Sequence, residues 1–505
     1  MDVELLTIYN GWAADLSELP RLPVADFRAA VIDRVARGGR LAALFGLPRD
    51  GKLDLVAVLA FDRDGMLELA SAPVGASYES LTPECPQAHL FEREIAEQFG
   101  VVPLNHPWLK PVRFHRSGTA ADAWGRAPGE PIVPGVADFF RVESHEIHEV
   151  AVGPVHAGII EPGHFRFQCN GENVLHLEIS LGYQHRGVET RLSAGPDPRS
   201  IHYVETAAGD TTIGHSLAYC HVSEALARCP VPARAQTLRG VALELERLAN
   251  HTGDLGAMGG DVGYLPTSSF CGRLRGDFLN MTAVLCGNRF GRGFNRPGGV
   301  GFDLEPRHAD DLRKHLAATF KDVKQAVGCL WTTPSVLGRF DGFGVLSREM
   351  AIDLGVVGPA ARASGLERDS RYNFANGIFQ FKQIPLATWG TGDIFARGYV
   401  RWLEIQHSTA FVDNLLDSLP EGPVKAVKPL LPAPNKIAVA LTEGWRGEIC
   451  HVAVTGPDGR FLRYKIVDPS FFNWMALAVA MRGQQVSDFP LCNKSFNLSY
   501  CGHDL

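Results

Sequence analysis

Apolar residues recur at two different spacings along the chain, and these spacings predict its elements. Val24–Ala36 carries apolar residues at helical spacing, and His89–Phe99 shows an amphipathic helical pattern that Gly100 ends. Strand-like runs lie between these two helices, at 41–47, 53–61 and 66–70. Residues 1–115 are therefore predicted to form a small α+β domain.

The pattern changes twice after this region. Residues 116–140 are small, polar and proline-rich, which is typical of a linker. In residues 141–505, short strands are predicted near 150–154, 164–168 and 174–179, with a turn at Asn170–Glu172. Helical spacing then dominates, at 238–249, 271–286, 309–327 and 394–416. The predicted fold is a mainly α-helical bundle behind a small β-sheet, preceded by the α+β domain.

Composition narrows the function class. The 505 residues are 45% hydrophobic and 21% charged, as in a globular protein of two or three domains. The net charge is -7, and no basic run favours nucleic-acid binding. No stretch approaches 18 consecutive apolar residues, so membrane association is expected only through partner subunits. The ten cysteines include no CxxC pair, which is unlike a disulfide scaffold or a familiar zinc site.

One motif in the first domain carries a resemblance. The sequence Phe91-Glu92-Arg93-Glu94-Ile95-Ala96-Glu97-Gln98-Phe99-Gly100, followed by His106-Pro107, resembles the signature of the 30-kDa-type subunit of complex I. That subunit is an α+β docking protein without a cofactor of its own. Without the resemblance, Glu92, Arg93 and Glu94 would be a solvated helix face.

Six blocks in the second region carry another resemblance. They include GPVHAG with EPGHF (153–165), GYQHRGVE (182–189), ERLANH (246–251), GPAARASG (358–365), RGE (446–448) and DPSFFNW (468–474). In this order, they resemble the 49-kDa-type subunit of complex I and the large subunit of group 4 nickel–iron hydrogenases. The sequence EPGHF and the fusion of both subunit types in one chain resemble the large subunit of formate hydrogenlyase-type hydrogenases.

The resemblance implies an oxidoreductase subunit of a membrane-associated, respiratory-type complex that couples electron transfer to proton or ion translocation. Its partners would be a small iron–sulfur subunit, which holds a 4Fe-4S cluster, and antiporter-like membrane subunits. The location implied is the cytoplasmic face of the inner membrane. No cofactor is assigned to this chain itself, and quinone is kept as an alternative ligand.

The resemblance also locates the nickel ligands, which are four cysteine thiolates in such hydrogenases. Alignment on His215-Ser216 and Ser495-Phe496 places the ligand positions at Ala208, Thr211, Ser499 and Gly502. None of these residues supplies the soft thiolate that the metals require. We therefore expect no nickel–iron site. One alternative is a substitute metal site made by Cys492, Cys501, His503 and His215. The other is that these cysteines are ordinary buried residues without a metal.

The same alignment gives four candidate catalytic residues: Glu161, His215, His156 and Asp210. His215 takes the position of the tyrosine that contacts quinone in complex I, and a histidine can donate a hydrogen bond or change protonation near neutral pH. Glu161 resembles the carboxylate that passes protons in group 4 hydrogenases. Asp210 makes the wall of the former metal cavity polar. Structural roles are the alternative for each residue.

The resemblance implies four cofactor-binding residues: Arg186, Arg289 and Arg296, which would face the partner's iron–sulfur cluster, and His251. Arginines near such a cluster would raise its potential, and surface salt bridges are the alternative. Three functions stay open at this point. They are a nickel-free redox-coupling subunit, a quinone-reducing subunit like that of complex I, and a non-catalytic scaffold.

Overall fold

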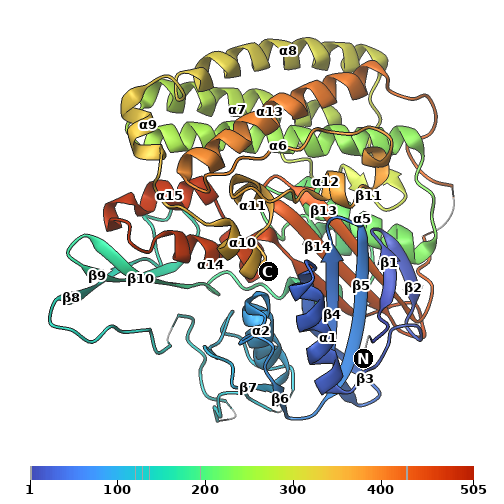
Figure 1. Cartoon of the computed structure of the whole chain (residues 1–505). Coiled ribbons are helices and arrows are strands. Elements are labelled where there is room, and N and C mark those ends of the chain that lie inside the picture. The colour runs from blue at the N-terminus through green and yellow to red at the C-terminus, as the bar shows by residue number, and fades with distance from the viewer. Residues whose placement is uncertain (1–2, 120, 128, 136, 194, 428–429) are drawn as a thin grey trace.

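The computed structural model describes residues 3–119, 121–127, 129–135, 137–193, 195–427 and 430–505. Helices make up 41% of the chain and strands 20%, which confirms the predicted mixture. The longest helices stack together at the top of Figure 1, and the two larger sheets lie beneath them. Within the described part of the chain, no helix has both the length and the apolar character needed to cross a bilayer.

The first sheet is antiparallel and has the strand order β1-β5-β4-β3. Its strands are β1 (Leu6–Tyr9), β3 (Arg40–Arg49), β4 (Lys52–Phe61) and β5 (Met66–Val74). Helix α1 (Val24–Ala36) packs on β4 and β5, and helix α2 (His89–Phe99) packs on β3. Both helices have the predicted bounds. Gly100 ends α2 with a left-handed backbone, φ 69°, as expected of a glycine stop.

A second four-stranded sheet joins the two ends of the chain. Strand β2 (Trp12–Asp15) pairs with β13 (Lys436–Gly444), and the order is β15-β14-β13-β2. The remaining strands are β14 (Gly447–Thr455) and β15 (Phe461–Val467). The spacing pattern predicts neither β2 nor the three C-terminal strands. Phe91 of α2 also packs edge-on against Phe472, with 5.5 Å between ring centroids. This sheet pairs a strand from before residue 115 with strands from after residue 140, and one hydrophobic core contains residues from both regions.

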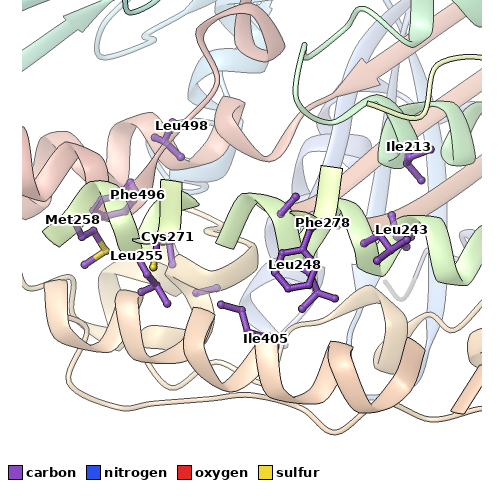
Figure 2. Packing of buried hydrophobic residues seen from close by; sticks show 14 of the residues in the cluster. Ile213, Leu243, Leu248, Leu255, Met258, Cys271, Phe278, Ile405, Phe496 and Leu498 are labelled. Carbon is purple, nitrogen blue, oxygen red and sulfur yellow. The ribbon is translucent and has the colours of Figure 1, made fainter. Parts of the chain in front are cut away.

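Five long helices build the second region. They are α5 (Thr212–Ala227), α6 (Ala233–Asp261), α7 (Leu265–Cys286), α8 (Pro306–Gly328) and α13 (Ile394–Asp417). Figure 2 shows Leu248 of α6, Phe278 of α7 and Ile405 of α13 gathered in the space between the helices. Apolar residues that recur every three or four positions form these packed faces. Helix α6 is buried along most of its length, which carries its polar residues into the interior.

Shorter elements complete the fold. The small sheet has the order β10-β9-β8, from β8 (Ile147–Val152), β9 (His164–Asn170) and β10 (Asn173–Ser180), with a tight turn between β9 and β10 as predicted. The short helices are α3 (Val188–Leu192), α4 (Ser200–Val204), α9 (Pro334–Phe340), α10 (Arg348–Asp353), α11 (Gly358–Ala363) and α12 (Ser370–Asn373). The short strands are β6 (Ser77–Glu79), β7 (Val102–Leu104), β11 (Asn295–Arg296) and β12 (Gly299–Val300). Three 3-10 turns span Pro86–Ala88, Gly377–Gln380 and Val486–Asp488.

The C-terminal residues are fixed inside the molecule. Helices α14 (Pro469–Ala480), α15 (Phe489–Phe496) and α16 (Tyr500–Asp504) follow the second sheet. The Asp504 carboxylate accepts hydrogen bonds from the backbone N–H groups of Gly182 and Gln184, at 2.8 and 2.9 Å. Because these bonds come from a loop more than 300 residues away, α16 is held at a defined position.

A close backbone contact fixes the loop between β13 and β14, and it gives a test of the packing. Gly358 has φ 71°, and a Cβ there would overlap the carbonyl oxygen of Arg446. We expect Gly358→Ala to lower the free energy of unfolding by about 3 kcal/mol or more. Gly38→Ala is the matched control, because Gly38 has φ 97° but no atom near its Cβ position. Urea unfolding should show a loss of about 1 kcal/mol for the control; equal losses in both variants would contradict the contact.

Candidate functional site

The loop before helix α5 places a carboxylate against a buried arginine. Asp210 accepts two hydrogen bonds from Arg446, at 2.5 and 2.7 Å. The Asp210 carbonyl oxygen also accepts from the Trp445 indole at 3.0 Å. Burial raises the pKa of Asp210, but the Arg446 cation outweighs this effect and holds it below the ordinary value. The Asp210 side chain is 34% exposed and that of Arg446 only 5%, so the ionised carboxylate forms the accessible side of the pair.

Four buried titratable side chains form one hydrogen-bonded chain behind this pair, called the buried chain below. His215 Nε2 lies 3.0 Å from the Asp468 carboxylate, and His215 Nδ1 lies 3.1 Å from His451 Nε2. His451 Nδ1 lies 2.9 Å from the Tyr464 hydroxyl. All four side chains are almost completely excluded from solvent. The predicted functional residue His215 is therefore held between an acid and a second histidine.

The ends of the buried chain determine where its protons lie. Burial raises the pKa of Asp468, but the hydrogen bond from His215 and the nearby Arg446 charge hold it below the ordinary value, so Asp468 is an ionised acceptor. His215 consequently carries its proton on Nε2. When the His215 ring is neutral, its Nδ1 accepts from His451 Nε2–H, and His451 Nδ1 accepts from the Tyr464 hydroxyl. Burial also lowers the pKa of His451 well below its ordinary value, which keeps that ring neutral.

The positions predicted to align with nickel ligands converge on the same place. Thr211 accepts a hydrogen bond from Arg446 at 3.3 Å, and Ser499 Oγ accepts from the backbone N–H of Gly502 at 2.9 Å. A Cβ at Gly502 would lie 2.6 Å from the Asp468 carboxylate. Asp468 therefore fills the space that a ligating side chain at 502 would need. A methyl group, two hydroxyls and a glycine do not fit a site for soft, thiolate-bound metals.

Glu161 reaches this place from the loop between β8 and β9. Its carboxylate accepts from the backbone N–H of Tyr500 at 3.3 Å. Burial raises the pKa of the Cys501 thiol to about 11, and the nearby Glu161 charge adds to this rise. The Cys501 sulfur lies 3.4 Å from Ser499 Oγ. The structure thus brings Glu161 beside the C-terminal part of the site.

His156 lies in the same loop as Glu161 but bonds within it. Its Nε2 lies 2.9 Å from the carbonyl oxygen of Gly163, and its ring packs near Phe165. Among the residues that the structure describes, no hydrogen bond joins His156 to His215. The catalytic role of His156 stays a prediction.

The predicted cofactor-binding residues lie in different surroundings. Arg186 is exposed and donates to the backbone carbonyls of Ala207 and Cys501, both at 2.9 Å, so it touches the edge of the site. Arg289 is exposed, with its guanidinium 4.7 Å from the centre of the Phe290 ring, and Arg296 is half-buried in β11. His251 lies inside the bundle, 2.7 Å from Glu404. Their roles toward a cluster stay predictions.

The substitute metal site is not assembled in the structure. Cys492 contacts the Arg397 guanidinium at 3.8 Å, whereas His503 Nδ1 lies 2.9 Å from the Asp504 carboxylate. Over the described ranges, no three side chains of His, Cys, Asp or Glu are grouped so that they could hold a metal ion. The ten cysteines, all described, are free thiols.

Four side chains of the site lie outside the set that the sequence predicted: Arg446, His451, Tyr464 and Asp468. Arg446 and Asp468 belong to blocks that carried the resemblance, and this position in a motif is the signal that could have found them. His451 and Tyr464 lie on the neighbouring strands β14 and β15. Polar residues scattered among the apolar residues of these strands give no comparable signal.

Comparison with known proteins identifies two family models in the chain. Residues 261–439 match the 49 Kd subunit of respiratory-chain NADH dehydrogenase, and residues 39–125 match its 30 Kd subunit. Both resemblances predicted from the motifs are confirmed.

Individual relatives extend these matches over most of the chain. The carbon monoxide-induced hydrogenase of Rhodospirillum rubrum is 32% identical over 69% of this chain and 97% of its own length. Formate hydrogenlyase subunit 5 of Escherichia coli is 29% identical over 92% and 84%. NADH-quinone oxidoreductase subunit 4 of Thermus thermophilus is 28% identical over 68% and 90%. The chain therefore belongs to the oxidoreductase family that unites the large subunits of these hydrogenases with the 49-kDa subunit of respiratory-chain NADH dehydrogenase, and it carries a 30-kDa-type domain on the same polypeptide.

Proposed function

We propose that this chain is the large subunit of a hydrogenase-related complex that works without a nickel–iron site and couples electron transfer to proton or ion translocation. The observation that carries the proposal is the content of the former metal position. The Asp468 carboxylate lies against Gly502, and the Asp210–Arg446 pair lies against Thr211. Ionised and hydrogen-bonding groups suit protons or a polar acceptor better than a thiolate-bound metal centre.

The polar residues of the site would then have different roles. Asp210 and Arg446 provide a fixed, oriented charge pair at the accessible side. Glu161 is the group that would exchange protons at the loop side, since it is half-buried beside Cys501. His215 would pass a proton to or from Asp468, 3.0 Å away, without any movement of the backbone.

The partners proposed are a small iron–sulfur subunit carrying a 4Fe-4S cluster and antiporter-like membrane subunits, at the cytoplasmic face of the inner membrane. The loop that holds Glu161 supports a partner at the site, because Ile159 is 87% exposed and Val155 73% exposed. The exposed guanidinium of Arg186 lies at the same edge, where it could pair with an anionic cluster.

Metal analysis of the purified complex tests the proposal. We expect several iron atoms per complex, nickel far below one atom per large subunit, and a cluster signal in electron paramagnetic resonance. The physical reason is the absence of thiolates at the four aligned positions. Nickel in stoichiometric amounts would overturn the proposal.

Two substitutions separate a redox role from a scaffold role. We expect His215→Ala and Glu161→Gln each to lower electron transfer and ion pumping by on the order of a hundredfold, the usual size of a lost proton-transfer group. Reduced methyl viologen as donor and a short-chain quinone as acceptor provide the assay. His308→Ala and Glu172→Gln are exposed controls and should retain activity. Full activity in both site variants would favour the scaffold.

A quinone-reducing subunit is the second candidate. The polar, partly accessible Asp210–Arg446 pair favours it, since charged and hydrogen-bonding groups could hold a quinone headgroup. The 28% identity to a NADH-quinone oxidoreductase subunit adds support. A change in the cluster spectrum on adding quinone would select this candidate.

A further inference from the structure

A pocket lies where helix α2 and the chain after it meet the second region, and it is called the α2 pocket below. Its walls come from α2, residues 108–114, β10 and α14, and no member of the buried chain lines it. The cavity volume is about 60 Å³. Because one water needs about 10–15 Å³, there is room for about five non-hydrogen atoms. The apolar part of the wall is formed by Leu90, Leu177, Ile179, Trp474 and Ala478.

Arg93 of α2 gives this pocket a positive charge. Its guanidinium donates to the backbone carbonyls of Lys110 and Pro111, at 2.8 and 2.9 Å, and lies 5.5 Å from the centre of the Trp108 ring. Within the described part of the chain, Nη1 of Arg93 has no hydrogen-bond partner, and no carboxylate forms an ion pair with the guanidinium. The cation is therefore held in position at the pocket wall, with the N–H groups of Nη1 left for a ligand.

The two carboxylates whose charges act on Arg93 are bound to other groups. Glu178 forms an ion pair with Lys110 at 2.9 Å. The Glu97 carboxylate accepts hydrogen bonds from the backbone N–H groups of residues 112–114. Burial lowers the pKa of Arg93 to about 10, and the charges of Glu97 and Glu178 only partly oppose this effect. An anion bound in the α2 pocket would supply the negative charge that the fold does not place beside Arg93.

We propose that the α2 pocket is a binding site for a short-chain monocarboxylate of about two to four carbons. The carboxylate accepts hydrogen bonds from Arg93 Nη1, and the alkyl group lies against the apolar wall around Trp474 and Ala478. A charge-assisted hydrogen bond of this kind is about twice as strong as one between neutral groups. The site is distinct from the proposed redox site, and the proposal does not depend on electron transfer.

The composition of the wall distinguishes this ligand class from others. The α2 pocket offers one unpaired cation, so a dicarboxylate or inorganic phosphate would bring further charge against apolar side chains, which costs free energy. A neutral amide or alcohol of the same size would leave the charge of Arg93 uncompensated. Because the walls come from both regions of the chain, a bound carboxylate also holds α2 against α14.

Titration of the full chain with propionate tests the proposal, with binding followed by saturation-transfer NMR of the ligand. We expect acetate, propionate and butyrate to bind with increasing affinity, about fourfold per added CH2 group, because each group is buried against the apolar wall. Propionamide has the same shape without the charge and should bind more weakly than propionate by about tenfold or more. Equal binding of propionamide, or equally strong competition by chloride or inorganic phosphate, would overturn the proposal.

Substitutions at two positions assign the binding to the α2 pocket. Arg93→Met removes the charge and should weaken propionate binding by about tenfold or more, whereas Arg93→Lys should retain part of the affinity. Ala478→Leu fills the cavity with a larger side chain and should abolish binding while Arg93 stays in place. Arg116→Met is the matched control, since Arg116 is exposed in the linker. Unchanged affinity in Ala478→Leu would overturn the site, and this variant and the propionamide comparison decide the outcome if Arg93→Met does not fold.

Discussion

Arg362→Met is expected to lower the free energy of unfolding by about 3–5 kcal/mol, because it removes the cation that pairs with the buried carboxylates of Glu443 and Glu404. Arg362 is completely buried and donates to Glu443 at 2.7 Å and to Glu404 at 2.5 Å. Glu404 also accepts from His251, at 2.7 Å. The arginine thus ties α11 to α13 and β13, so the effect should spread to the whole second region.

The loss of stability caused by Arg362→Met should also depend on pH, and the titration of Glu443 determines whether the loss grows or shrinks as pH rises. Burial raises the pKa of Glu443 to about 7, and Arg362 opposes that rise. Without Arg362 the folded pKa moves higher still. A carboxyl with a raised folded pKa destabilises the fold as pH rises from its unfolded pKa to its folded pKa. The difference between variant and parent should therefore be larger at pH 8 than at pH 6.

Urea unfolding of the full chain at both pH values measures this effect. Arg348→Met is the matched control, because Arg348 is exposed and bonds one backbone carbonyl, and its change should stay within about 0.5 kcal/mol. Adding Glu443→Gln to Arg362→Met should recover part of the loss, since Glu443 is the carboxylate that loses its ion pair with Arg362. If Arg362→Met lowered the free energy of unfolding no more than Arg348→Met, the buried ion pairs of Arg362 would make no net contribution to stability.

Local patterns in the sequence predicted the elements whose faces differ in polarity. The bounds of α1 and α2 agree with the prediction because each has one apolar side and a clear stop. Strands β13–β15 were missed because they are buried on both faces, so no alternation marks them. The pairing of β2 with β13 joins residues more than 400 positions apart, and no local pattern encodes such a contact.

The site shows the same limit. Alignment to a family pointed to Asp210, His215 and Glu161, and the structure places these residues around the same loops. It could not supply His451 or Tyr464, because their contact with His215 arises only when β14 and β15 pack against α5. The contact between Asp468 and His215 could not be predicted either, because an Asp-Pro-Ser sequence is fully explained as an ordinary helix start.

That double role of Asp468 makes Asp468→Asn the sharpest test of the buried chain. The Asp468 carboxylate caps α14 by accepting from the Ser470 N–H at 2.8 Å, and it accepts from His215 through its other oxygen. Asparagine is an equally good N-cap, so its oxygen keeps the helix start. Its amide N–H group then faces His215 Nε2, which must become an acceptor. His215 would carry its proton on Nδ1, and His451 would follow.

The substitution therefore reverses every donor and acceptor from 468 to 464 while the shape is retained, and an amide cannot take up the proton. We expect electron transfer by the complex to fall by on the order of a hundredfold or more, with a thermal unfolding midpoint close to that of the parent. Asp468→Ala should lose both activity and stability, because it also removes the cap. In the Asp468→Asn background, Tyr464→Phe should cause no further loss of activity, since the donor and acceptor order of the buried chain is already reversed. Independent, multiplying losses in the double variant would show that Asp468 and Tyr464 do not act in one chain.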